Sequence, residues 1–280
     1  MHSATLTRFA PAPTGYLHLG HALNAKLVWE YARALNGRVL LRVEDHDRER
    51  CKPEYEAAIL DDLDWLGFAP DVFPTSAFRK GQCESRQSDR LAIYAAASAD
   101  LASRGLIYGC TCSRNEIAAA AGNTRGEEPR YPGTCRTRGI PPEHGVVWRL
   151  RLEDGSESFE DLICGPQRQE PMAQCGDVAI RDRKGNWTYQ FVASVDDFVQ
   201  DIDLVVRGRD LLASTARQIQ IARLLGRETP AVFAHHNLIM KSATQKLSKS
   251  DGDTGIRDLR KAGHTAAEVL KMASGAPGPG

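Results

Sequence analysis

The sequence predicts an α/β protein in which a parallel sheet is interrupted by an inserted segment. Apolar runs of strand length alternate with helical periodicity in the first and last thirds of the chain, as strands and helices do around a parallel sheet. The stretch 110–145 differs, because it holds three cysteines and many glycine, proline and arginine residues with little periodicity. We therefore expect a core in two halves with an insertion between them.

The first half of the core is predicted to begin with a strand, a helix and a second strand. Residues 5–10 form a short strand pattern that ends at a turn rich in proline and glycine. Leucine side chains then recur at helical spacing up to Gly37, which we expect to stop the helix. Residues 38–45 are an apolar run typical of a parallel strand buried on both faces. The unit has the size of a right-handed crossover.

Further helices and antiparallel strands are expected along the next part of the chain. Helical patterns cover residues 53–66 and 86–103. Residues 146–152 and 177–182 alternate between apolar and polar side chains as antiparallel strands do, and residues 183–186 are typical of a hairpin turn.

The second half of the core returns with a buried strand at residues 203–208, followed by a helix over 211–226. A short helical stretch is expected at residues 265–273, and residues 274–280 have the composition of a disordered tail. The expected units are the two halves of the core at 1–105 and 187–236, the insertion at 106–186, and a functional loop with a short stem at 237–273.

Composition and charge exclude several classes of protein. Lys plus Arg and Asp plus Glu both number 36, so the chain has no general basic field and is not expected to coat nucleic acid. We expect a cytoplasmic protein, because no apolar run has the length of a membrane span and the N-terminus lacks a secretory signal. The seven cysteines favour reduced thiols and a metal site, since Cys110 and Cys112 are too close for an ordinary disulfide.

The turn after the first strand, APAPTGYLHLGHA, has the features of a phosphate site. In a parallel sheet such a turn feeds a helix whose unpaired N–H groups attract anions. Gly15 allows the turn, Gly20 leaves room for a flat purine, and His18 and His21 can donate to phosphate oxygens. Taken alone the HxGH pattern is weak, because a histidine at a helix start is more often a capping or solvated residue than a functional one.

A second candidate element is KLSKS at residues 246–250. Lys246 and Lys249 could close over a triphosphate and neutralise charge that builds up during displacement at phosphorus. A Lys/Ser run by itself is usually a solvated loop. The two segments together indicate chemistry at the α-phosphate of ATP.

Several segments then carry a resemblance to a known family, the class I glutamyl-tRNA synthetases. RFAPAPTGYLHLGHA, LLRVEDHDRER, YQFVASVDD, VVRGRDLLASTARQ and KLSKS occur in that family's order and spacing, over roughly residues 5–250. The resemblance implies a Rossmann-type catalytic core that makes an aminoacyl adenylate from ATP with Mg²⁺. It also implies that His18, Gly20 and His21 bind ATP as the HIGH motif. Lys246 and Lys249 would belong to the KMSKS loop, with Lys249 contacting ATP.

The amino acid substrate is expected to be L-glutamate. Its two carboxylates and one ammonium group require two cationic side chains and one acid. Arg8 lies in the first predicted strand, and Glu44 and Arg207 lie at the ends of later ones. Tyr189 adds a hydroxyl donor. The resemblance implies that Glu44 takes the ammonium group and the arginines take the carboxylates. The alternative role for these arginines is a surface or interface salt bridge. The resemblance implies further contacts from Phe9, Ala10, Pro11 and Ala12.

The cysteines of the insertion suggest a structural zinc site. Cys110 and Cys112 are followed by Cys135, and three thiolates with tetrahedral geometry suit Zn²⁺ when a fourth ligand closes the site. Clustered cysteines can also be small buried apolar residues. Small paralogues of glutamyl-tRNA synthetase resemble this pattern with Cys, Cys, Tyr and Cys, which implies Tyr131 as the fourth ligand. The other cysteines match nothing and are expected to be structural: Cys51, Cys83, Cys164 and Cys175.

The length of the sequence bears on the expected function. It ends thirty residues after Ser250, so we expect no separate anticodon-reading domain. This combination resembles the truncated paralogues known as glutamyl-Q tRNA(Asp) synthetases. The resemblance implies ATP-dependent activation of glutamate and its transfer to queuosine at the wobble position of tRNA(Asp). We expect a monomer that binds no membrane.

Two alternatives remain open from the sequence. The first is a catalytic fragment that charges a conventional tRNA acceptor end, or a regulatory adenylate-binding protein that performs no transfer. The second is a small nucleotidyltransferase, a class that also carries HxGH and a stretch comparable to Ser214, Thr215 and Arg217. KLSKS and the set of Arg8, Glu44, Tyr189 and Arg207 argue against the nucleotidyltransferase.

Overall fold

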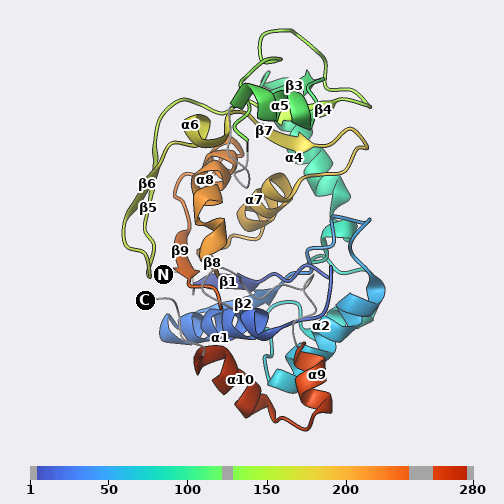
Figure 1. Ribbon diagram of the computed structural model, residues 1–280, viewed down its shortest axis with the longest axis vertical. Coiled ribbons are helices and arrows are strands. Elements are labelled where there is room, and N and C mark those ends of the chain that lie inside the picture. Colours follow the sequence, from blue (N-terminus) through green and yellow to red (C-terminus); the bar gives the residue numbers. More distant parts are fainter. Residues whose placement is uncertain (1–4, 122–128, 240–254, 276–280) are drawn as a thin grey trace.

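The structure is a computed structural model that describes residues 5–121, 129–239 and 255–275. Its centre is a four-stranded parallel sheet in the order β2-β1-β8-β9 (Figure 1). The parallel sheet predicted from the sequence is therefore confirmed. Its strands are β1 (Leu6–Phe9), β2 (Arg38–Leu41), β8 (Leu204–Gly208) and β9 (Val232–His236).

Both faces of this sheet are covered by helices, as the apolar strands predict. Leu204 and Val206 of β8 belong to the core shared with α1 (Leu19–Ala34), whereas Val205 between them packs with Ile219 of α8 on the other face. Figure 1 shows α1 and α10 on one side of the sheet, with α7 and α8 on the other. The covering helices are α2 (Pro53–Leu66), α7 (Tyr189–Val199), α8 (Thr215–Leu224) and α10 (Ala266–Gly275).

The insertion contains a second, antiparallel sheet in the order β3-β4-β7. The alternating patterns predicted β4 and β7, whereas β3 was not predicted. The predicted hairpin turn lies at its end, with Gly185 at φ 91°. A separate hairpin of β5 and β6 follows β4. The strands are β3 (Ile107–Cys110), β4 (Val147–Leu150), β5 (Glu157–Phe159), β6 (Gln167–Gln169) and β7 (Val178–Arg181).

Three expected helix boundaries differ from the structure. The helix expected from residue 86 begins as α4 (Leu91–Ser103). Arg86 is extended and pairs with Val43, whose carbonyl accepts from the Gln87 N–H, and residues 87–89 form a short 3₁₀ helix. The helix expected from residue 211 begins only at Thr215, because residues 211–214 belong to the 3₁₀ helix η2 (Arg209–Ser214). The helix expected to end at residue 273 continues through Ser274 and Gly275, two residues assigned to the tail.

Gly37 has a different role from the one expected. The left-handed residue after α1 is Asn36, with φ 49°, and not the glycine. A Cβ atom on Gly37 would lie 2.4 Å from the carbonyl oxygen of Thr5. Glycine is therefore required because the helix exit passes directly against the start of β1.

Several short elements were not predicted. The strands β5, β6 and β9 have three to five residues, and polar side chains within them obscure the period of two. The unpredicted helices are α3 (Thr75–Arg79), η1 (Gln87–Asp89), α5 (Arg114–Ala121), α6 (Pro171–Cys175) and α9 (Ile256–Lys261).

The described residues contain no helix long and apolar enough to cross a membrane.

Candidate active site

A cleft of about 1040 Å³ lies at the carboxyl end of the parallel sheet. This edge is where ligands bind in α/β folds, because successive strands end there in loops that feed helices. The cleft brings together residues from β1, α1, the segment after β2, α7 and β8. The predicted site residues that line it are Arg8, Ala10, Ala12, His18, Gly20, His21, Glu44, Tyr189 and Arg207.

Two of the residues expected to contact glutamate do not line this cleft. The ring of Phe9 is 1% exposed and packs against Trp29, with ring centroids 5.9 Å apart. Successive side chains of a strand point to opposite faces, so Phe9 faces the core where Arg8 faces the cleft. Pro11 is also buried, and its carbonyl oxygen accepts a 3.0 Å hydrogen bond from the Glu44 N–H.

The two histidines cap helix α1 and also line the cleft. His18 is the N-cap residue, and its Nδ1 accepts a 3.1 Å hydrogen bond from the Gly20 N–H. The Nδ1 atom of His21 accepts a 3.1 Å hydrogen bond from the His18 N–H. Because both Nδ1 atoms accept, each neutral ring carries its hydrogen on Nε2. Capping and function are therefore compatible, since capping fixes the tautomer that can donate to an anion.

Gly20 is required by the same geometry. A Cβ atom at Gly20 would lie 2.9 Å from Cε1 of the His18 ring. Glycine is therefore required here because a side chain would clash with the His18 ring. The sequence had suggested only that Gly20 leaves room for a purine.

The KLSKS segment, including Lys246 and Lys249, lies outside the described residues. Its expected role therefore stays a prediction. The cleft does extend to Gly255 and Asp258, which directly follow that part of the chain.

Arg8 and Arg207 both line the cleft but have different partners. The Nε atom of Arg8 lies 3.1 Å from Asp197 Oδ1 in an ion pair. Among the described residues Arg207 donates to uncharged acceptors alone, one of which is Gln218 Oε1 at 2.6 Å. Burial lowers the pKa of Arg207, and the nearby charge of Arg8 acts in the same direction. In the part of the chain that the structure describes, neither arginine forms a surface salt bridge, which was the alternative role.

Glu44 and Tyr189 complete this end of the cleft. Oε1 of Glu44 accepts from Nη2 of Arg42 at 3.0 Å, and the residue is only 6% exposed. Burial raises the pKa of the Tyr189 hydroxyl, and the negative charge of Glu44 raises it further. Tyr189 is therefore a neutral hydroxyl donor at ordinary pH.

Sequence reasoning missed the buried network that joins these groups. Arg42 is 0% exposed and bridges Glu44 to Asp197, whose Oδ1 atom it contacts at 2.8 Å. Burial alone would raise the pKa of Asp197, but Arg8 and Arg42 hold it at about 2. Asp196, the neighbouring acid, pairs with Arg90 at 2.7 Å. One feature of the sequence could have identified Arg42: it is a charged residue within an otherwise apolar strand pattern.

We expect Arg42→Met to lower the free energy of unfolding by about 3–5 kcal/mol, because it leaves Glu44 buried without its cationic partner. Urea unfolding followed by circular dichroism measures this. The matched control is Arg79→Met, since Arg79 also contacts two carboxylates but is exposed, and we expect it to cost less than about 1 kcal/mol. Equal effects of the two substitutions would contradict a stabilising role for the buried network.

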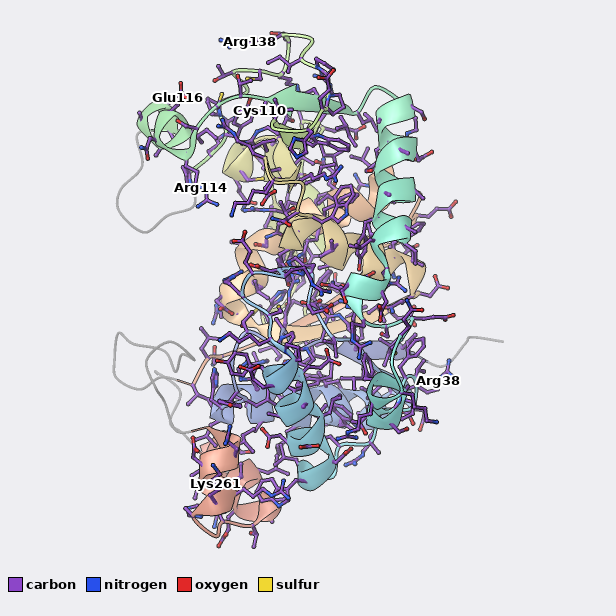
Figure 2. All side chains as sticks on the ribbon, turned by 90° about the vertical axis from the view of Figure 1, so that its right-hand side faces the viewer. Arg38, Cys110, Arg114, Glu116, Arg138 and Lys261 are labelled. Carbon is purple, nitrogen blue, oxygen red and sulfur yellow. The ribbon has the colours of Figure 1, made fainter. Side chains whose placement is uncertain are left out.

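The cysteines of the insertion form a compact cluster. The Sγ atoms of Cys110, Cys112 and Cys135 all lie within 4.8 Å of one another. The Tyr131 hydroxyl oxygen is 3.4 Å from Cys110 Sγ and accepts from the Cys135 N–H at 2.9 Å. Figure 2 shows Cys110 near Arg114 and Glu116 of α5, at the end of the molecule remote from Lys261. All seven cysteines are free thiols.

This donor set fits a tetrahedral metal ion. Sulfur atoms that share one Zn²⁺ lie about 3.8 Å apart, given zinc–sulfur bonds of about 2.3 Å, and Cys112 Sγ and Cys135 Sγ are 3.6 Å apart. Burial raises the pKa of Cys112, whereas hydrogen bonds led by that from the Thr111 backbone outweigh burial and lower the pKa of Cys135. Cys135 therefore ionises more readily than Cys112 to bind a cation.

The residues that suggested a nucleotidyltransferase lie outside the cleft. Thr215 is 0% exposed, and its hydroxyl oxygen accepts from Arg207 at 2.8 Å. Ser214 accepts a 3.1 Å hydrogen bond from Gln190. Thr215 therefore holds Arg207, which lines the cleft, and Ser214 holds Gln190.

Comparison with known proteins agrees with this arrangement. The family described as tRNA synthetases class I (E and Q), catalytic domain, matches residues 4–272, and the chain belongs to this class of ligase enzymes. A glutamyl-Q tRNA(Asp) synthetase of Rhodobacter capsulatus is 39% identical, and the match covers 95% of this chain and 99% of that protein. Within the class, the chain belongs to the glutamyl-Q tRNA(Asp) synthetase family.

Longer relatives match over part of their length. Glutamate--tRNA ligase 2 of Acidithiobacillus ferrooxidans is 40% identical over 94% of this chain, which spans 56% of that protein. A solved glutamate tRNA ligase from Elizabethkingia meningosepticum, in complex with its amino acid, has a TM-score of 0.73 and 28% identity. That match covers 90% of this chain and 53% of the solved chain.

Proposed function

We propose that this enzyme activates L-glutamate with ATP and transfers the glutamyl group to queuosine at the wobble position of tRNA(Asp). The observation that carries the proposal is a single cleft that joins a donor pair, His18 and His21, to Arg8, Glu44 and Arg207. The near full-length match to a glutamyl-Q tRNA(Asp) synthetase supports the choice of acceptor.

Glutamate binds at the end of the cleft formed by β1 and β8. Arg8 and Arg207 each bind one carboxylate, and Glu44 accepts from the ammonium group. Tyr189 donates its hydroxyl hydrogen to the substrate. A guanidinium group favours a carboxylate over a neutral amide because the pair gains both charge attraction and hydrogen bonds. This arrangement selects an amino diacid.

ATP binds against the N-terminus of α1 with Mg²⁺. The positive end of the dipole of α1 attracts phosphate, and Nε2 of His18 and His21 donate to phosphate oxygens. A carboxylate oxygen of glutamate attacks the α-phosphorus and pyrophosphate leaves, which forms glutamyl adenylate. Negative charge builds on the phosphorus oxygens during this step, so fixed donors lower the barrier. Lys246 and Lys249 assist by closing over the triphosphate.

The acceptor is chemically compatible with this core. The cyclopentene ring of queuosine carries a cis-diol, which resembles the 2′,3′-diol of a terminal ribose. One hydroxyl of that diol attacks the activated carbonyl, an ester bond forms, and AMP leaves. A cleft that serves one diol in longer synthetases can therefore accept the other.

The inserted segment 106–186 carries one structural Zn²⁺ held by Cys110, Cys112, Tyr131 and Cys135. The ion, when bound, ties β3 to the turn that contains Cys135. The compact cluster of three sulfur atoms beside the Tyr131 hydroxyl supports this proposal.

The function is tested with labelled glutamate, ATP and tRNA(Asp) that either contains or lacks queuosine. We expect label only on the queuosine-containing tRNA. We expect no label when the queuosine diol is oxidised with periodate before the reaction. Label on both forms would refute the choice of acceptor.

A second candidate function is the charging of a conventional acceptor end, because a glutamate--tRNA ligase is 40% identical over nearly the whole chain. This function predicts that removal of the 3′-terminal adenosine abolishes labelling. Retention of label after that removal argues for queuosine.

A further inference from the structure

Arg207 is held by a set of acceptors that carry no charge. Its Nε donates to His235 Nε2 at 2.9 Å, and its Nη atoms donate to Gln218 Oε1 and Thr215 Oγ1 at 2.6 and 2.8 Å. Within the described ranges no Asp or Glu forms an ion pair with it, whereas Arg8 pairs with Asp197. The position of this guanidinium group therefore depends on neutral hydrogen bonds.

His235 is the partner whose hydrogen-bonding state can change. Its ring has 0% side-chain exposure, and Nδ1 lies 2.5 Å from Asp161 Oδ2. A guanidinium group only donates, so His235 Nε2 must accept and the ring hydrogen must be on Nδ1. Burial, and then the charge of Arg207, lower the pKa of His235 to about 4 despite the opposing effect of Asp161. The ring is therefore neutral near pH 7.

Asp161 is itself rigidly anchored. Its Oδ1 accepts from the N–H groups of Ile163 and Cys164 at 2.9 and 2.8 Å, within the segment between β5 and β6. That segment pairs with β9, since the Leu162 N–H donates to the Phe233 carbonyl at 2.8 Å. The carboxylate thus has one oxygen fixed by the backbone and the other directed at His235.

We propose that Asp161 and His235 are positioning residues that orient Arg207 toward a carboxylate of glutamate and so set the affinity of the cleft for that substrate. This role rests on the proposed function. Asp161 keeps the hydrogen on Nδ1, and His235 then offers only an acceptor to Arg207. The guanidinium group is held by its Nε edge while remaining available to a substrate anion. The arrangement resembles the support of metal-bound histidines by carboxylates, with an arginine in place of the metal.

The test is Asp161→Asn. The amide oxygen can still accept from the Ile163 and Cys164 N–H groups, but the amide NH₂ then faces His235 Nδ1 as a donor. We expect the ring hydrogen to move to Nε2, where it opposes the Arg207 Nε–H. Long-range ¹H–¹⁵N correlation of the imidazole nitrogens reports this tautomer without any reference to activity.

Glutamate-dependent pyrophosphate exchange measures the consequence. For Asp161→Asn we expect the KM for glutamate to rise about 10- to 100-fold, the value of one hydrogen bond to a charged group. We expect the KM for ATP to change less than about threefold. Asp71→Asn is the matched control, because Asp71 accepts from the Val39 N–H on the same sheet but lies outside the cleft. We expect this control to leave both KM values unchanged.

Two substitutions of His235 keep the inference testable if Asp161→Asn does not fold. His235→Gln keeps an acceptor for Arg207 and is expected to stay within about fivefold of the wild-type KM for glutamate. His235→Phe removes the acceptor and is expected to raise that KM as Asp161→Asn does. Equal KM values for the Gln and Phe variants would overturn the inference.

The outcomes separate this inference from the proposed function. A wild-type protein without glutamate-dependent exchange refutes the proposed function. A wild-type protein that activates glutamate, but whose His235 carries its hydrogen on Nε2, overturns the positioning role. A changed tautomer in Asp161→Asn with an unchanged KM for glutamate also overturns it.

Discussion

Arg8→Met is expected to lower kcat/KM for glutamate in pyrophosphate exchange about 10²- to 10³-fold. The substitution removes one cationic partner of the substrate from a buried position, and loss of one member of a buried charge pair costs about 2–5 kcal/mol. The fold should survive, because Asp197 keeps Arg42 as a partner at 2.8 Å. Exchange kinetics at saturating ATP measure the effect.

The matched control for this substitution is Arg38→Met. Arg38, labelled in Figure 2, is exposed and begins β2. Arg8 lies near the carboxyl end of the adjacent strand β1. We expect the control to change kcat/KM less than about twofold. If Arg8→Met has as little effect while remaining folded, Arg8 does not bind the substrate.

Cys135→Ser is expected to abolish stoichiometric zinc binding and to destabilise the insertion. A structural zinc site in a small peptide contributes about 10–16 kcal/mol of apparent binding free energy, so a site with one thiolate fewer should lose the ion during purification. Inductively coupled plasma mass spectrometry measures the zinc content, and differential scanning calorimetry measures the melting of the insertion. We expect a lower melting temperature together with the loss of zinc.

Cys164→Ser provides the comparison for the zinc experiment. Cys164 is half-buried, and its Sγ lies 3.6 Å from the His235 carbonyl oxygen, which a serine hydroxyl can also contact. We expect its zinc content to equal that of the wild type. A metal-free wild-type protein with normal melting and normal activity would refute the zinc site.

Much of the core could be predicted from sequence because its elements have clear periods. The helix 53–66 has the boundaries that its pattern predicts. The strand β9 was missed because two of its five residues are histidines, which read as polar. His235 is buried there only because Asp161 and Arg207 satisfy its ring nitrogens, and those partners are 74 and 28 positions away.

The candidate site, like the fold, could be predicted from sequence only where local patterns mark its residues. His18 and His21 stand in a local motif at a predicted helix start, so their position could be expected from sequence. The contacts of Arg42 with Asp197 and of His235 with Asp161 join segments 155 and 74 residues apart. No local pattern encodes such pairings, since they depend on which strands and helices become neighbours in the sheet. Sequence therefore identifies groups that face the cleft more readily than groups that hold them.

The ion pair between Arg8 and Asp197 joins residues 189 positions apart. Contacts at such separation form late in folding, because a long stretch of chain must be ordered before its ends meet. During synthesis, a growing polypeptide that does not yet include α7 contains Arg8 but lacks its carboxylate partner. Because Asp258 also lines the cleft, the complete site can assemble only when nearly all of the polypeptide has been made.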